Sequence, residues 1–270
     1  MSEFEKLKIV TKYELLKQFR RKRFYGALVI TVLAVILTIG LYKGLDLPRQ
    51  MGIPENLINQ YGAEIFAIFV TGMGSLAILG AVFFAGDAIA SEFERKTGYI
   101  LFPNPVKRAT LVVGKYLACF IATATILIIA YLISAGALLG FYGQVPSGIF
   151  GSLAIALMLA CCVISMAFAF SSLLKGGMGA TIATLLIIML IAPIISISLS
   201  YAGHEPWFML DYAGDAVSNT YKISLEQVGG GGPMGGIRNP DPAISFLVLL
   251  GYTVILFILS VWVTKRREMI

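Results

Sequence analysis

Few side chains in this chain of 270 residues are suited to covalent or acid–base chemistry. There is one histidine, His204, and there are three cysteines, Cys119, Cys161 and Cys162. Adjacent cysteines do not have the spacing of a metal site, and a lone histidine makes neither a metal cluster nor a catalytic triad. The pattern Gly-x-x-x-x-Gly-Lys-Ser/Thr, which holds nucleotide phosphates, does not occur. The sequence therefore predicts no catalytic residue, no metal site, no cofactor bound by this chain and no ATP hydrolysis through that motif.

Charged residues of both signs gather between positions 87 and 115. The stretch from Asp87 to Lys96 has helical spacing, Gly98 can end such a helix, and the prolines that follow prevent it from continuing. The pattern predicts a short charged helix, and an ordinary solvated loop with an ion pair is the alternative. The residues singled out are Asp87, Glu92, Glu94, Arg95, Gly98, Pro103, Pro105, Arg108, Gly114 and Lys115.

The elements that position this cluster are indicated by a run of 59 residues without charge, between Lys115 and Lys175. A membrane helix needs about 20 apolar residues, so the run predicts two spans. Backbone groups in hydrocarbon must pair within a helix or a closed barrel, and the alternation typical of barrel strands is missing. Hydrophobic residues make up 58% and charged residues 13% of the chain. The predicted fold class is an all-α integral membrane protein.

Six apolar stretches predict six transmembrane helices within a domain of residues 24–264. They cover about residues 24–42, 65–85, 117–139, 149–174, 178–202 and 243–264. The first is short, but the basic run Arg20–Arg23 precedes it and Lys43 follows it. It is not a cleaved signal peptide, because a polar-rich segment precedes it and no small-residue cleavage site follows.

The basic residues predict the orientation. With the N-terminus in the cytosol, 17 of the 21 lysines and arginines fall in cytosolic segments. Positive residues remain on the cytosolic side, so both termini are expected there, in a multi-pass protein of the cell membrane. The net charge of +6 and the pI of about 9.2 then reflect topology rather than a nucleic-acid partner.

Four segments lie outside the predicted spans. Residues 1–23 are expected to form an amphipathic helix lying on the inner leaflet, with a simple positive anchor as the alternative. Residues 86–108 and 265–270 form a cytosolic segment and a tail. Residues 203–242 are extracytoplasmic and begin with an aromatic helix or helical hairpin at the outer interface. This aromatic part is predicted to be either an outer gate or a simple cap on the bundle. The gate candidates are Trp207, Phe208 and Tyr212.

The charged cluster also carries a family resemblance. The pattern Glu92-x-Glu94-Arg95-x-x-Gly98, then Pro103-x-Pro105-x-x-Arg108 and Gly114-Lys115, resembles the permease subunits of ABC-2 type exporters. In that family a Glu–Arg pair, a glycine and a proline precede a Gly–Lys at the start of the third span. The six spans, the N-terminal helix and the outer segment between spans 5 and 6 fit the same plan.

The resemblance implies a mechanism and partners. Two permease subunits, identical or different, would form the translocation path between them, with spans 2 and 5 as its lining. Two copies of a separate ATPase subunit would hold ATP and Mg²⁺ and dock on residues 86–108, the coupling segment. Carried over, Asp87, Glu92, Glu94, Arg95 and Gly98 fall at or beside the ATPase contact.

Two other functions remain open from the sequence. A membrane-embedded accessory or assembly factor would need no transport path. A secondary carrier would need an ionisable group within the membrane or an internal repeat, and neither is apparent.

Overall fold

The computed structural model describes residues 2–72, 74–91, 107–174, 176–223 and 240–266. Within these ranges the chain is helical and contains no strand. Six helical stretches are long and apolar enough to cross a membrane. The predicted fold class, an all-α membrane protein with six candidate spans, is therefore confirmed.

The helices follow the chain in a simple order. They are α1 (Glu3–Arg20), α2 (Lys22–Gly44), α3 (Leu47–Gln50), α4 (Glu55–Thr71), α5 (Gly74–Ala85), α8 (Arg108–Tyr142), α9 (Gly148–Leu173), α10 (Gly177–Leu186), η1 (Ile187–Ile191), α11 (Ala192–Tyr201), α12 (Leu210–Asp215) and α13 (Pro242–Arg266). The candidate spans are α2, α4 with α5, α8, α9, α10 to α11, and α13.

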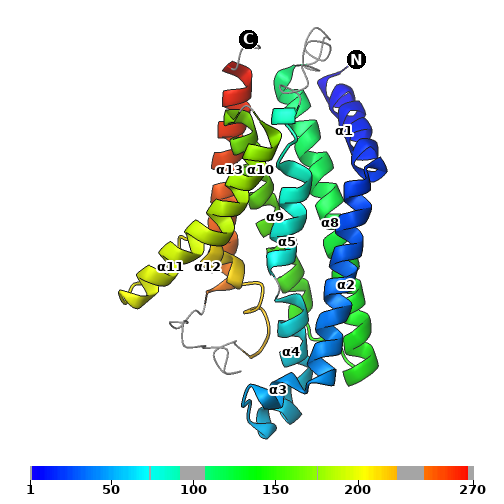
Figure 1. Ribbon diagram of the computed structural model, residues 1–270, viewed down its shortest axis with the longest axis vertical. Coiled ribbons are helices and arrows are strands. Elements are labelled where there is room, and N and C mark those ends of the chain that lie inside the picture. The colour runs from blue at the N-terminus through cyan, green and yellow to red at the C-terminus, as the bar shows by residue number, and fades with distance from the viewer. Residues whose placement is uncertain (1, 73, 92–106, 175, 224–239, 267–270) are drawn as a thin grey trace.

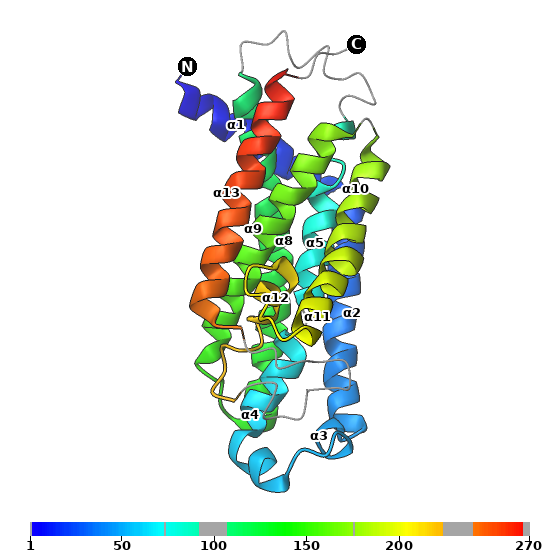
Figure 2. The ribbon, with the colours of Figure 1, turned by 90° about the vertical axis from the view of Figure 1, so that its left-hand side faces the viewer.

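The bundle has two distinct ends. The first residues of α1 and the last residues of α13 lie at one end, here called the terminal end (Figure 1). Helix α3 and the start of α4 lie at the opposite end, here called the distal end (Figures 1 and 2). Span 2 and α9 are the most enclosed of the six. Of the residues in their most apolar parts, 67% and 61% are buried within the protein, against 17% for span 5 and 17% for α13. Spans 2 and 4 are therefore the centre of this subunit, and span 5 lies at its edge.

The second span differs from the continuous helix predicted over residues 65–85. It begins earlier, at Glu55, and is divided into α4 and α5, with Gly72 as the C-cap of α4. A β carbon on Gly72 would lie 2.5 Å from Ser218 Oγ, so a residue of the outer segment occupies the space beside this break. A hydropathy pattern reports apolar character alone and therefore does not reveal the interruption.

The fifth span also changes its backbone along its length. A π-helical turn, η1, separates α10 from α11, and Pro193 is the second residue of α11. Because proline has no N–H, the regular i→i−4 bonding cannot continue through it, and a local π turn is one way in which a membrane helix satisfies the freed backbone groups. Beyond η1 the helix diverges from the bundle (Figure 1).

The N-terminal helix is anchored on the start of α8. Helix α1 begins with a capping box between Ser2 and Glu5 and ends at Arg20, where Arg21 is extended and α2 starts. It packs along the terminal part of α8, which begins at Arg108, nine residues before the predicted span. A β carbon on Gly114 would lie 2.6 Å from Val10 Cγ1. Glycine at this position therefore allows the close approach of α1 to α8.

This contact predicts that Gly114→Val destabilises the protein by about 2 kcal/mol, because the added side chain overpacks the α1–α8 contact. The matched control is Gly136→Val on the same helix, where a β carbon meets nothing within 4 Å. Thermal unfolding of the purified protein in detergent measures both variants. Equal losses for the two variants would contradict the assigned role of Gly114.

Candidate functional site

A charged network at the terminal end joins α1 to α8. Lys115 Nζ donates to Glu14 Oε1 at 2.9 Å, and the Lys115 side chain is only 8% exposed. Lys17 Nζ lies 3.5 Å from Glu14 Oε2 on the same helix. The Gly–Lys pair predicted to lead into span 3 thus contacts the N-terminal helix. Gly114 allows α1 to approach closely, and Lys115 binds the Glu14 carboxylate of α1.

Two lysines set the charge of the Glu14 carboxyl. Burial by itself raises the pKa of Glu14, but the positive charges of Lys115 and Lys17 and their hydrogen bonds outweigh it. The pKa therefore lies below its ordinary value, and the ionised form is stabilised in the folded protein.

The same face of α1 reaches the end of span 2. Gln18 Nε2 donates to the carbonyl oxygen of Phe84 and to Cys119 Sγ, each at 3.4 Å. The Cys119 thiol also donates to the Phe84 carbonyl, at 3.1 Å. Three helices, α1, α5 and α8, are therefore tied together where α5 ends.

The start of the predicted coupling segment is held from two further sides. Asp87, the second residue after α5, accepts a hydrogen bond at 2.6 Å from Arg23 Nη1, at the start of α2. The backbone N–H groups of Ile89 and Ala90 donate to Ser171 Oγ, near the end of α9, at 3.1 Å and 2.8 Å. The turn at residues 87–91 is thus attached to spans 1 and 4 as well as to span 2.

A cavity of about 580 Å³ lies between α5 and α10, beside this turn. Its walls come from apolar side chains of both helices, and the charged side chains among its described lining are Arg23 and Asp87. The described residues that line it are Arg23, Leu79, Val82, Phe83, Asp87, Ser91, Gly177, Met178, Thr181, Ile182 and Leu185. Spans 2 and 5 therefore flank an open cavity with one polar end and apolar sides.

Other residues singled out in the sequence have varied positions. Arg108 Nη1 donates to the carbonyl oxygen of Lys265 at 3.3 Å, which joins the start of α8 to the end of α13. The six residues Glu92, Glu94, Arg95, Gly98, Pro103 and Pro105 lie outside the described residues. Of the predicted ATPase contact, the described structure therefore covers Asp87 and the turn that follows it.

The gate candidates do not share one environment. Trp207 and Phe208 are exposed, and their rings meet edge to face with centroids 5.9 Å apart. Tyr212, on the short helix α12, is buried and 4% exposed. In its described part the outer segment has one six-residue helix, which packs on α11 and α13 rather than forming a helical hairpin. Figures 1 and 2 place α12 part-way along the bundle and away from the distal end.

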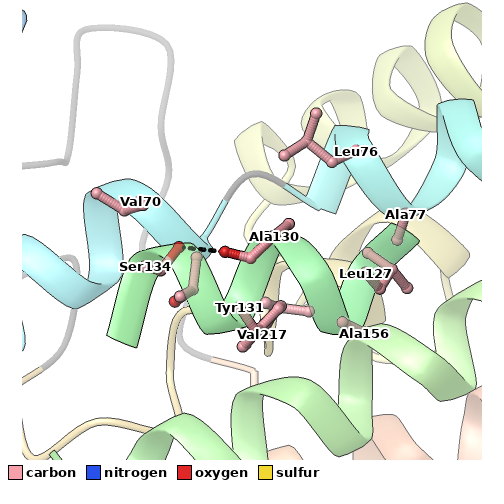
Figure 3. Close-up of a pocket in the computed structure, with 10 residues that line it drawn as sticks. Val70, Leu76, Ala77, Leu127, Ala130, Tyr131, Ser134, Ala156 and Val217 are labelled. Atoms are coloured by element: carbon pink, nitrogen blue, oxygen red, sulfur yellow. Dashed lines mark hydrogen bonds between the residues drawn. The ribbon is translucent and has the colours of Figure 1, made fainter. Parts of the chain in front are cut away.

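The chain after α12 enters the bundle beside the break in span 2. Val217 lines a small cavity with residues of α4, α5, α8 and α9, including Val70, Leu76 and Ala130 (Figure 3). The hydroxyl groups of Tyr221 and Thr71 are hydrogen-bonded to each other. The volume of this cavity is about 10 Å³, which is at the lower limit for one water molecule. The outer segment thus closes the bundle at the break instead of leaving an open path there.

Sequence reasoning missed these contacts between the outer segment and span 2. The break itself could have been suspected from a pair of glycines, Gly72 and Gly74, because glycines inside an apolar stretch can mark an interruption of a helix. The described residues contain no group of three or more His, Cys, Asp or Glu side chains that could hold a metal ion.

Six candidate spans and a polar network at the terminal end define a multi-pass α-helical membrane protein. The sequence model of a family described as "ABC-2 family transporter protein" matches residues 8–269, nearly the whole chain. The chain therefore belongs to the ABC-2 transporter family and is a permease component of an ABC transporter. A comparison with curated protein sequences gives no match.

The lowered pKa of Glu14 predicts a pH-dependent stability. Ionised Glu14 stabilises the folded state above its ordinary pKa, and this contribution is lost as the pH falls through the lowered value. The variant Glu14→Gln should lose about 3 kcal/mol at neutral pH, because Lys115 then loses its carboxylate partner. The difference in the free energy of unfolding between this variant and the wild type should become smaller as the pH is lowered.

Thermal unfolding in detergent from neutral pH to about pH 3 measures this difference. Glu205→Gln, at an exposed position, is the matched control and should follow the wild type. A gap between wild type and Glu14→Gln that stays constant with pH would contradict the role of the ionised carboxylate.

Proposed function

We propose that this chain forms the translocation path of an ATP-driven exporter, works as a dimer and is coupled to a separate ATPase subunit. The family match over residues 8–269 carries the proposal. The absence of a Gly-x-x-x-x-Gly-Lys-Ser/Thr motif from the sequence supports it, because the nucleotide must then be hydrolysed elsewhere. ATP and Mg²⁺ belong to the ATPase, of which two copies dock on one permease dimer.

The terminal end is the proposed docking face, on the cytosolic side of the cell membrane. The turn at residues 87–91 hydrogen-bonds to α2 through Asp87 and to α9 through Ser171. A displacement of the segment that follows is therefore passed directly to spans 1, 2 and 4. Such a connection suits a coupling segment better than a loop that touches only its own neighbours.

Span 5 supplies the proposed contact between permease subunits. Its apolar side chains are exposed along the whole helix, for example Met178 at 79%, Leu190 at 54% and Ile194 at 56%. A second subunit on this face would also cover the cavity between spans 2 and 5. The path then runs between the subunits, and the outer segment with Trp207 and Phe208 closes its far end.

Reversing the charges of the coupling segment tests the link to the ATPase. The double variant Glu92→Arg/Arg95→Glu should reduce permease-stimulated ATP hydrolysis by about 5- to 150-fold, the usual range of a coupling free energy. Co-purification of the ATPase with the permease should weaken in parallel. The assay uses both subunits reconstituted in liposomes.

The matched control reverses Asp46 and Arg49, an exposed ion pair at the distal end with 3.3 Å between Arg49 Nη1 and Asp46 Oδ2. This control should leave both readings unchanged. Unchanged partner binding and stimulation in the Glu92/Arg95 variant would remove the coupling segment from the proposal.

Cysteine cross-linking tests the dimer contact. In a background without the three native cysteines, Leu190→Cys should cross-link to a second permease subunit in membranes, because span 5 is the proposed interface. Leu132→Cys on α8 is the control, since Leu132 is 65% exposed but lies on another helix. Cross-linking through Leu132→Cys alone would assign the interface to span 3 instead.

A further inference from the structure

We propose that the cavity between α5 and α10 binds an amphiphile with an anionic head and an apolar tail. The head binds the Arg23 guanidinium in competition with Asp87, and the tail lies between spans 2 and 5. This inference names the class of ligand for the proposed path and rests on the proposed function in that respect.

The shape and lining of the cavity favour an amphiphile. Its volume of about 580 Å³ falls within the range of about 300–1,000 Å³ for small-molecule sites. Leu79, Val82 and Phe83 line it from α5, and Ile182 and Leu185 line it from α10. A polar solute would leave its hydrogen bonds unmade along these walls, whereas an apolar tail would not.

The polar end of the cavity favours an anionic head. Arg23 is the last of four consecutive basic residues that begin at Arg20, and its side chain is 54% exposed. A guanidinium carries five N–H donors in a fixed fork, which matches the oxygens of a phosphate or a carboxylate. Nη1 donates to Asp87, and because the Arg23 side chain is half-exposed, an anionic head can reach the guanidinium and compete with Asp87 for it.

A cationic head fits this end less well. Asp87 is the acidic residue in the described lining, its side chain is 15% exposed, and Arg23 already neutralises it at 2.6 Å. A cation that approaches Asp87 also meets the positive field of the run Arg20–Arg23. The positive charge at the polar end of the cavity therefore favours an anionic head over a cationic one.

Head binding would reach the coupling segment through one ion pair. An anion that binds Arg23 weakens the bond to Asp87, and Asp87 is the first charged residue of the segment 86–108. The turn would then be attached to the bundle through Ser171 and its bonds to Ile89 and Ala90. Occupation of the cavity thereby changes how firmly the coupling segment is held.

The test measures lipid binding to the purified chain alone, in nanodiscs of phosphatidylcholine. The probes are spin-labelled phosphatidic acid and spin-labelled phosphatidylcholine, and the readout is the immobilised fraction as a function of probe concentration. Phosphatidic acid should bind more tightly than phosphatidylcholine. Arg23→Gln should reduce its affinity by about tenfold, the effect of losing one hydrogen bond to a charged group.

Four further variants separate this site from general charge attraction. Asp87→Asn should raise the affinity for phosphatidic acid, because the competing carboxylate is removed. Lys22→Gln removes the same charge from the adjacent exposed residue and should have little effect. Leu185→Trp fills the cavity and should reduce the binding of both probes. Arg23→Lys should have an affinity for phosphatidic acid between those of the wild type and Arg23→Gln. Thermal unfolding confirms that each variant is folded.

Several outcomes would overturn the inference. Equal losses of phosphatidic acid affinity for Lys22→Gln and Arg23→Gln would mean that net charge alone attracts the lipid. Unchanged lipid binding by Leu185→Trp would mean that the lipid binds only at the outer surface of the protein. Displacement of the probe by millimolar glycerol phosphate would mean a site for the head alone. Because no ATPase is present, a negative result here leaves the coupling test untouched, and a negative coupling test leaves this binding result standing.

Discussion

Hydrocarbon offers no water to an unpaired backbone N–H or C=O group, and each such group costs several kcal/mol there. This constraint makes every candidate span of the chain a helix. It also determines where a helix can be interrupted, since irregular backbone is tolerated only where protein rather than lipid surrounds it. The break in span 2 meets this condition, because Ser218, Val217 and Tyr221 of the outer segment pack beside it. The outer segment is therefore part of the bundle rather than an appendage.

The terminal end holds many of the described polar contacts that join distant parts of the chain. Glu14 bonds Lys115, Gln18 bonds the end of α5, and Arg23 bonds Asp87. Each bond starts on α1 or at the start of α2 and ends on or beside another span. The N-terminal region thereby connects the turn at residues 87–91 with the start of α8. A partner that displaces this turn acts on several helices at once.

Span 5 is the least restrained helix in the subunit. Few of its side chains are buried, and Pro193 with the π turn directs its second half away from the other helices. Its first half approaches the end of α5 closely, because a β carbon on Gly86 would meet the Thr181 side chain. One half of span 5 thus flanks the cavity with span 2, while the other half offers an apolar face to lipid or to a second subunit.

The sequence alone determined the fold class, the number of candidate spans and the family. These follow from hydropathy and from a local motif, which depend on residue types at fixed spacing. It also placed Gly114 and Lys115 in the family motif, but their contacts with Val10 and Glu14 required the structure, since the partners are about a hundred residues away. The broken second span, the buried position of Tyr212 and the Arg23–Asp87 pair were likewise decided by tertiary packing. Hydropathy records whether a side chain avoids water, whereas these features depend on which surface of another helix it meets.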